Sequence, residues 1–447
     1  MAGSRYSRNA VMLRRVTPSL MREGGGEERC ILEGTHMRTD AMRLILTNGT
    51  VVTPDGVIAG GSVVIEGERI VEVTDATYPT SLSGDEQVLD VGGRYIIPGV
   101  ICLHNDGLEK AFNPRPNTNF PADFALRTYD AQLAAAGITT QFHALSFLTL
   151  AAKQRSLDDA ITMSHAVRAF TEAGGGTLDH FVCFRCDVRQ PGSLDAILTC
   201  IEDAPVRLVT INDHVPGQGQ YRNVELFLKQ MRPYLPPDKQ TDADLWEYHN
   251  TRIQHKAETE HVVEETYVRL AHEARTRDFI LASHDDDSPE KVEIMHRLGC
   301  RMAEFPITVE AARRARELGM HVSIGAPNAV RGGSLTGNAS ATELAQLGLV
   351  DILIADYHAP SILYAAWRWA RAGIVSLPDA VAMTGANPAT VAGLTDRGSL
   401  APGLRADVLV IEEAGDVPVV AAHIVAGAMR HQRFGVGRRV AAPVASA

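Results

Sequence analysis

The hydrophobic positions in the long central part of the chain form short runs that alternate with helix-like segments. Eight of these runs are apolar enough to be buried strands. They cover residues 95–103, 138–144, 180–187, 207–212, 279–283, 301–305, 321–325 and 351–355. Strands that alternate with helices are typical of parallel β/α units, and eight such units close a barrel. The pattern therefore predicts a (β/α)8 TIM-like barrel over residues 96–395.

Local signals at the helix ends agree with the barrel. Ser288 before Pro289 is typical of a helix start, and Ser340 with Glu343 has the spacing of a capping box. We expect residues 214–278, a charged insertion between two strands, to be helical. Glycines stand where four helices should end before the next strand, at Gly137, Gly299, Gly319 and Gly348.

Both flanks of the barrel have the pattern of short β-strands. Runs of β-branched residues with turn residues between them occur in 43–95 and again in 396–435. The dipeptide Asn48-Gly49 predicts a hairpin turn within the first flank. Two such segments around an α/β centre indicate one small β-sandwich domain that is built from both chain ends.

Composition and charge restrict the class of protein. The chain has 447 residues, 45% of them hydrophobic, and a formal net charge of -11. No apolar run approaches the roughly 18 residues that cross a bilayer, and an acidic chain offers no extended basic face to nucleic acid. The six cysteines are dispersed and no secretory signal precedes them, so we expect a cytoplasmic protein without disulfides. We expect residues 1–42 to be a disordered extension and 436–447 a flexible tail, and a homo-oligomer is compatible with the sequence.

Polar residues follow abruptly on five of the predicted strands, at the end where the active site of such a barrel lies. Each one alone is more often a helix cap, a surface residue or a hydrogen-bonded group. Together they form the imidazole and carboxylate set that holds a hydrolytic metal and leaves a position for water. The predicted metal ligands are His104, Asp106, Asp187, His214, His284 and Asp356. We expect one or two divalent ions, with zinc ahead of manganese or iron.

Spacing and order within this set predict individual roles. In a strand, residues i and i+2 point to the same face, so His104 and Asp106 should both enter the barrel mouth. Asp356 follows the last strand, and we predict that it is the general base that takes a proton from the attacking water while it also contacts the metal.

Several longer motifs resemble the amidohydrolase superfamily over about residues 43–430. The superfamily frame is carried by Ile97-Pro98-Gly99, His104-x-Asp106, Thr384-Gly385-Ala386-Asn387-Pro388-Ala389, Gly398-x-Leu400-x-Pro402-Gly403 and Ala406-Asp407. Finer motifs are similar to the PhnM-type diphosphatases of the carbon-phosphorus lyase pathway. These are Leu108-Glu109-Lys110, Pro114-Arg115-Pro116, Asp213-His214-x-Pro216-Gly217-Gln218, Ala282-Ser283-His284-Asp285-Asp286, Glu304-Phe305-Pro306 and Gly325-Ala326-Pro327-Asn328.

The resemblance implies hydrolysis of a phosphorylated sugar phosphonate, α-D-ribose 1-methylphosphonate 5-triphosphate, to the 5-phosphate and pyrophosphate. Cleavage of a phosphoanhydride needs an activated water and cations that neutralise the transferring oxygens. Basic residues at or after strand ends are the candidates for substrate binding, namely Lys110, Arg115, Arg185, Arg222 and Arg331. Arg331 is favoured because the neighbouring Gly332-Gly333 allows close approach of the backbone to phosphate.

The third strand departs from the family pattern. It carries Cys183, Arg185 and Asp187, where the resemblance leads us to expect a histidine before the arginine and a glutamate after it. No lysine ends this strand, so a carboxylated-lysine bridge is not expected. Cys183 and Cys186 have the spacing of a redox or zinc pair, but a strand sends i and i+3 to opposite faces, which disfavours that role.

Two other functions compete with the diphosphatase. A deacylase, deaminase or cyclic amidase would share the fold and the metal ligands while cutting a C–N bond. A triphosphate substrate differs in requiring several of the five basic side chains to converge near the metal. A non-catalytic barrel is the second alternative, and the retention of all six candidate ligands disfavours it.

Overall fold

The structure is a computed structural model that describes residues 43–79, 86–150, 153–333 and 338–433. The described residues belong to one compact unit. The predicted N-terminal extension, 1–42, and the predicted tail, 436–447, lie outside the described residues. No helix in the described ranges is long and apolar enough to cross a membrane.

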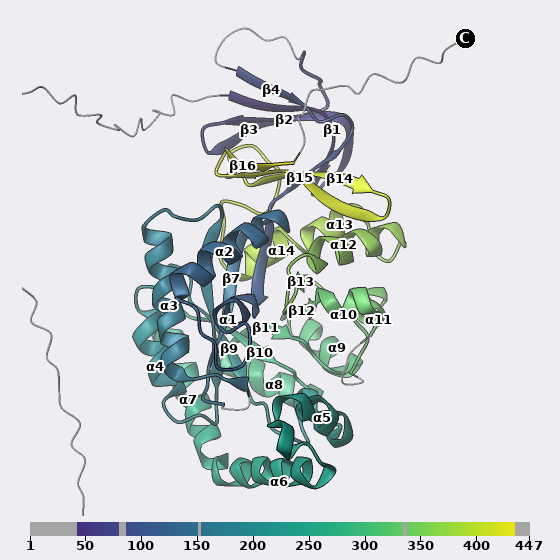
Figure 1. Cartoon of the computed structure of the whole chain (residues 1–447). Helices are drawn as coiled ribbons and strands as arrows, with labels where there is room; N and C mark the ends of the chain where they lie inside the picture. Colours follow the sequence, from purple (N-terminus) through teal and green to yellow (C-terminus); the bar gives the residue numbers. More distant parts are fainter. Residues whose placement is uncertain (1–42, 80–85, 151–152, 334–337, 434–447) are drawn as a thin grey trace, which may run out of the picture. The chain divides into compact units, whose positions relative to one another are not determined.

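Eight parallel strands form the barrel, and each of the eight runs predicted from the hydrophobic pattern contains one of them or most of one (Figure 1). The strands are β6 (Val100–Asn105), β7 (Ile138–Phe147), β8 (Asp179–Asp187), β9 (Leu208–Asn212), β10 (Ile280–His284), β11 (Cys300–Glu304), β12 (His321–Gly325) and β13 (Ile352–Ile354). Each pairs with the next along the chain. A single parallel bridge between Asn105 and Asp356 brings the last strand against the first. The closing contact therefore lies where candidate site residues stand.

Alternate residues of the barrel strands belong to two different cores. Ile101 on β6, Phe142 on β7 and Met302 on β11 share one buried cluster, which must lie inside the barrel because it joins strands from around its circumference. Val100 and Leu145 belong to the second cluster, which packs against the surrounding helices. This division follows from the two-residue period of a strand, and burial on both faces explains the nearly continuous apolar runs.

The helices lie where the local signals indicate. They are α1 (Gly107–Phe112), α2 (Ala122–Ala135), α3 (Leu157–Glu172), α4 (Ser193–Ile201), α5 (Val224–Met231), α6 (Asp242–Glu258), α7 (Glu260–Arg277), α8 (Pro289–Leu298), α9 (Val309–Glu317), α10 (Ala326–Arg331), α11 (Ala341–Gln346), α12 (Ser361–Arg371), α13 (Leu377–Ala382) and α14 (Ala386–Val391). The insertion after β9 is helical, as predicted. Ser288 Oγ accepts a hydrogen bond from Lys291 N at 3.2 Å and caps α8. Ser340 begins α11 without a side-chain capping bond, so the expected capping box does not form.

Strands from both chain ends form a second, mostly antiparallel sheet with its own core, which confirms the predicted small β domain. Its strands are β1 (Arg43–Thr53), β2 (Gly56–Glu66), β3 (Arg69–Thr74), β4 (Glu86–Asp90), β5 (Tyr95–Pro98), β14 (Val408–Ala414), β15 (Val417–Val425) and β16 (Ala428–Gln432). In Figure 1 the purple N-terminal strands and the yellow C-terminal strands share this sheet. β5 pairs with both β1 and β14, and so it joins the two flanks.

Two local predictions in this region are corrected. The run that begins at Tyr95 is two strands, because β5 ends at Pro98 in the small sheet and β6 begins the barrel after Gly99. Asn48-Gly49 is not a hairpin turn. β1 continues through it with an irregular register, and Asn48 has φ 59°. A β-carbon at Gly49 would come within 2.5 Å of Ile96 Cδ1, so glycine is required there for packing against β5.

Candidate active site

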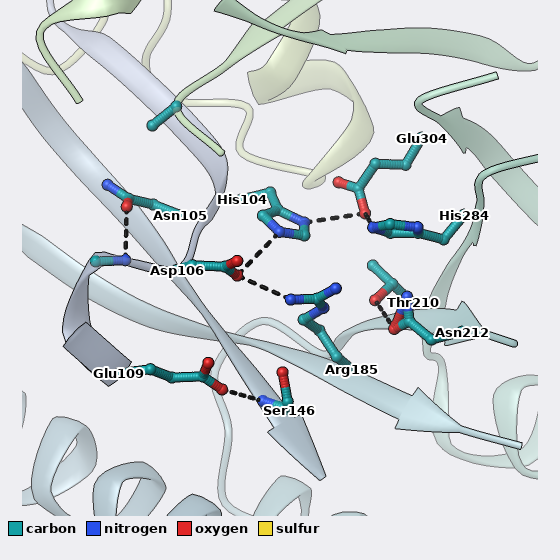
Figure 2. A network of polar contacts seen from close by, with 12 residues as sticks. His104, Asn105, Asp106, Glu109, Ser146, Arg185, Thr210, Asn212, His284 and Glu304 are labelled. Atoms are coloured by element: carbon teal, nitrogen blue, oxygen red, sulfur yellow. Dashed lines mark hydrogen bonds and ion pairs between the residues drawn. The ribbon is translucent and has the colours of Figure 1, made fainter. Parts of the chain in front are cut away.

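The carboxyl ends of β6, β10 and β11 bring two histidines and a glutamate together. His104 Nδ1 lies 3.0 Å from Glu304 Oε2, and His284 Nε2 lies 3.8 Å from the same oxygen. Figure 2 shows the Glu304 carboxylate between the two imidazole rings. The three side chains offer ligand atoms within 4.8 Å of one another, so they could hold one metal ion.

An irregularity in β6 directs His104 into this cluster. Ile101 and Leu103 already face the barrel interior, so strict alternation would place His104 on the outer face. However, two residues lie between Cys102 and Asn105 on β6, whereas only one lies between their partners Gln141 and His143 on β7. The extra residue is a β-bulge, a feature that often re-aims a side chain beside an active site. The bulge therefore explains how His104 reaches Glu304.

Glu304 is the candidate ligand that sequence reasoning missed. Its side chain is 0% exposed, and within the described residues the nearest polar contact is His104 Nδ1, 3.0 Å from Oε2, which does not form a well-directed hydrogen bond. A buried carboxylate without donors is costly unless a cation or another donor satisfies it. Glu304 ends a predicted strand and stands in a motif that resembles the family, so its strand-end position was the available signal. The unmet acceptors fit a metal ion at this position.

A second group joins His214, His284 and Asp285. Asp285 Oδ2 lies 2.9 Å from His284 Nδ1 and 3.2 Å from His214 Nε2, so one carboxylate oxygen faces both rings. Asp285 adopts φ 55°, an uncommon backbone conformation for a residue other than glycine. Burial lowers the pKa of His214 to about 4, which keeps its imidazole neutral and able to act as a ligand.

A third group joins His104, Asp106 and Asp356 at the seam of the barrel. His104 Nε2 lies 3.3 Å from Asp106 Oδ1. The backbone of Asp356 donates to His104 O at 3.1 Å and accepts from Asp106 N at 2.6 Å, which fixes the last strand against the first. Burial and the nearby charge of Asp106 raise the pKa of Asp356 to about 6. A carboxylate with that pKa can accept a proton near neutral pH.

Arg185, on β8, is the predicted cation that the structure places directly in this cluster. Its Nη1 donates to Asp106 Oδ1 at 2.8 Å, and the side chain is buried (Figure 2). Burial alone would raise the pKa of Asp106, but the charge of Arg185 and the contact with His104 outweigh it and hold that pKa well below its usual range. A permanent positive charge therefore lies beside the candidate metal ligands.

The structure does not bring three of the predicted residues to the cluster. Asp187 Oδ1 accepts a hydrogen bond from Arg189 N at 3.0 Å, a local turn that holds its carboxylate at the end of β8. Arg222 and Arg331 are exposed. None of the three lines either of the two cavities at this end of the barrel. Because α10 continues to Arg331, this residue stands at a helix end rather than at a strand end.

Two adjacent cavities lie at this end of the barrel. The smaller one, about 230 Å³, is lined by the candidate metal residues His104, His214, His284 and Asp356. The larger one, about 920 Å³, is lined by the predicted substrate residues Lys110 and Arg115 and by two cations that the sequence reasoning missed, Lys153 and Arg155. Their shared walls are Asp106, Lys153, Arg155 and Tyr357.

The two cysteines of the third strand lie apart in the structure. Cys183 belongs to the cluster inside the barrel, whereas Cys186 belongs to the cluster beneath the helices. Both are buried and free of disulfides. This confirms that the spacing of Cys183 and Cys186 reflects two faces of one strand rather than a redox pair.

Comparison with known proteins identifies the family. No family model matches the chain. The α-D-ribose 1-methylphosphonate 5-triphosphate diphosphatase of Escherichia coli (strain K12) is 36% identical over 370 residues, which cover 82% of this chain and 94% of that protein. The chain belongs to this diphosphatase family. The family predicted from the motifs is therefore confirmed, and the chain is a hydrolase, as predicted.

Solved structures support the same fold at lower identity. A 5-methylcytosine deaminase from Klebsiella pneumoniae has a TM-score of 0.57 and 15% identity, covering 88% of this chain and 99% of that one. A β-aspartyl dipeptidase from Fervidobacterium islandicum AW-1 has a TM-score of 0.56 and 14% identity, covering 89% and 99%. An amidohydrolase has a TM-score of 0.54 and 16% identity, covering 88% and 100%. The chain therefore shares its overall fold with these three proteins.

Proposed function

We propose that this chain hydrolyses a phosphoanhydride of α-D-ribose 1-methylphosphonate 5-triphosphate and releases pyrophosphate and the 5-phosphate. The observation that carries the proposal is the 36% identity that extends over 94% of the diphosphatase relative. The chemistry of the site supports it, because histidine and carboxylate side chains meet beside a buried arginine and a cavity lined by cations. A triphosphate needs that combination of metal ligands and positive charge.

The proposed metal ligands come from three overlapping groups of side chains. His104 belongs to two of these groups, and His284 also belongs to two. The proposed ligands are His104, Asp106, His214, His284, Glu304 and Asp356, with Asp285 either as a ligand or as the group that orients His214 and His284. Nitrogen and carboxylate oxygen donors suit zinc, and also manganese or iron. One or two divalent ions fit these overlapping groups. When bound, such an ion supplies a Lewis acid for the phosphoryl oxygens and activates water.

The residues of this chain supply the remaining steps. Asp356 accepts the proton of the attacking water, whose oxygen forms a new bond to phosphorus as the bridging P–O bond of the anhydride breaks. Arg185, held by Asp106, stabilises negative charge on the transferring group. Pyrophosphate leaves with the bonding electrons of the broken bond. Lys110 and Arg115 bind substrate from the larger cavity, whereas Arg222 and Arg331 are left out of this proposal because they line neither cavity.

The decisive experiment compares substrates at equal concentration with metal-loaded protein. The ribose phosphonate triphosphate is incubated beside a nucleoside triphosphate and simple amides, and pyrophosphate, phosphate and ammonia are followed. Pyrophosphate release from the phosphonate substrate, with no turnover of amides, is the expected result. Hydrolysis of an amide with no pyrophosphate release would instead assign the barrel to C–N bond chemistry. Stoichiometric metal with no turnover of any of these substrates would contradict the proposed activity.

A further inference from the structure

The larger cavity offers an anion-binding surface outside the group of candidate metal ligands. Four basic side chains line it, and Arg155 is the one with a carboxylate partner, because its Nη2 lies 2.5 Å from Glu109 Oε2. In the part of the chain that the structure describes, Lys110, Arg115 and Lys153 form no ion pair. Three carboxylates also line the cavity, but Asp106 is paired with Arg185 and Glu109 with Arg155. Among the described residues, three cations without an ion pair therefore face one such carboxylate, Asp159, and this excess of positive charge favours an anionic ligand.

Aromatic rings hold two of these cations at the cavity wall. Lys110 Nζ lies 4.8 Å from the centroid of Tyr357, and Lys153 Nζ lies 6.0 Å from that of Tyr234. Lys153 Nζ also donates to Tyr221 Oη at 3.4 Å. These contacts orient the ammonium groups without neutralising them, since a ring or a hydroxyl carries no formal charge. The lysines therefore remain available to an anion.

Part of the cavity wall is apolar. Phe112, Pro233, Leu235 and Pro236 contribute to it, together with the exposed ring of Tyr234. Small-molecule sites combine such surfaces with a few placed polar groups. A wall of this composition suits an organic ring that carries an anionic group better than it suits inorganic pyrophosphate, which has no apolar surface to bury.

Size separates the roles of the two cavities. The 230 Å³ cavity contains the candidate metal residues, so the reacting phosphates belong there. The 920 Å³ cavity shares four lining residues with it and has room for the larger remainder of the substrate. We propose that the larger cavity binds the ribosyl methylphosphonate end, with the phosphonate monoanion held by Lys110, Arg115 and Lys153. This inference rests on the proposed function and adds the orientation of the substrate.

The orientation predicts how the enzyme selects its substrate. A ribose 5-triphosphate with a hydroxyl in place of the phosphonate would present the same reacting phosphates but nothing for Arg115 and Lys153 to bind. Removing one of these cations should therefore weaken turnover of the phosphonate substrate selectively. A charged contact to an anion contributes on the order of 1.4 kcal/mol or more, which corresponds to a factor of about ten.

The experiment pairs variants with substrates. Lys153→Met and Arg115→Met each remove a charge but keep an unbranched apolar stem, and Lys239→Met is the matched control on the neighbouring segment Pro237–Lys239, outside the cavity lining. For the phosphonate substrate, kcat/KM should fall at least tenfold in both variants. For ribose 5-triphosphate it should change less than about twofold, and the control should match the wild type with both substrates. Metal content should be unchanged throughout.

Two outcomes would overturn the orientation. Equal losses on both substrates would place the triphosphate in this cavity, and no loss on either would leave the cations without a role in binding. Calorimetric titration with α-D-ribose 1-methylphosphonate keeps the test independent of turnover. If the wild type hydrolyses neither triphosphate, the proposed function fails. Binding of this ligand that Lys153→Met abolishes would still support the subsite, whereas absence of binding to the wild type would refute it.

Discussion

Glu304→Gln is the sharpest test of the candidate metal centre, because it changes charge and leaves shape almost intact. The carboxylate is fully buried, has no well-directed hydrogen-bond donor among the described residues, and lies 3.0 Å from His104 Nδ1. Without metal, the amide oxygen of glutamine can occupy the place of Oε2 beside the same imidazole nitrogen. The metal-free variant should therefore fold, with a free energy of unfolding within about 1 kcal/mol of the wild type.

Metal affinity should respond far more strongly than stability. An amide oxygen carries no formal charge, and damage to a metal shell typically weakens binding about tenfold to a hundredfold. A hundredfold rise in the metal Kd corresponds to about 2.7 kcal/mol of binding free energy. At a fixed, saturating metal concentration, the metal would then stabilise the folded variant by about 2.7 kcal/mol less than it stabilises the wild type. The substitution should thus lower the free energy of unfolding of the metal-loaded protein by about that amount more than it lowers the free energy of unfolding of the metal-free protein.

The assay is a competition between the protein and a chromophoric chelator, with elemental analysis after dialysis and denaturant unfolding with and without metal. Glu310→Gln, at an exposed position in the first turn of α9, is the matched control and should bind metal like the wild type. A Glu304→Gln variant with unchanged metal Kd and stoichiometry would remove Glu304 from the ligand set. It would also refute the inference that its unmet acceptors mark a cation site.

Three further variants test the remaining residues. His214→Ala should lower metal content or turnover about tenfold or more, and full activity with stoichiometric metal would exclude His214 as a ligand. Asp356→Asn should keep the fold and much of the metal but lose turnover, because an amide ligates through oxygen yet cannot accept the proton of water; parallel loss of metal and activity would make Asp356 a ligand alone. Arg331 was predicted from the sequence to contact phosphate, but it is exposed and lines neither cavity, so Arg331→Lys should change kcat/KM less than about twofold. A tenfold loss of kcat/KM would instead support a role of Arg331 in substrate binding.

The sequence determined the architecture because the relevant signals are local. A strand that is buried on both faces needs an unbroken apolar run, and a helix needs caps within one turn of its ends. All eight barrel strands could therefore be predicted within a few residues. The positions of His104, Asp106, His284 and Asp356 followed as well, because polar side chains that interrupt such runs at the carboxyl end of a parallel barrel must gather at one mouth.

Only the tertiary structure decided which strand-end groups converge. Glu304 and Asp187 both end strands, yet Glu304 faces two histidines, whereas Asp187 bonds to its own turn through Arg189. That difference depends on local turn geometry and on neighbours far along the chain, which a hydrophobic pattern does not encode. The bulge that turns His104 inward is likewise a property of the β6 and β7 pair rather than of either strand.

The same reason explains the cations. Arg331 stands in a glycine-rich stretch that suggested phosphate binding, but it ends helix α10 and stays exposed. Lys153 lies in the segment between β7 and α3, and the fold places it in the wall shared by both cavities, beside Tyr221 from the segment after β9. Sequence fixes which charges exist and on which kind of element they lie. Which of them share a cavity depends on how the loops after the strands pack together at the barrel mouth, and those contacts join residues distant in the chain.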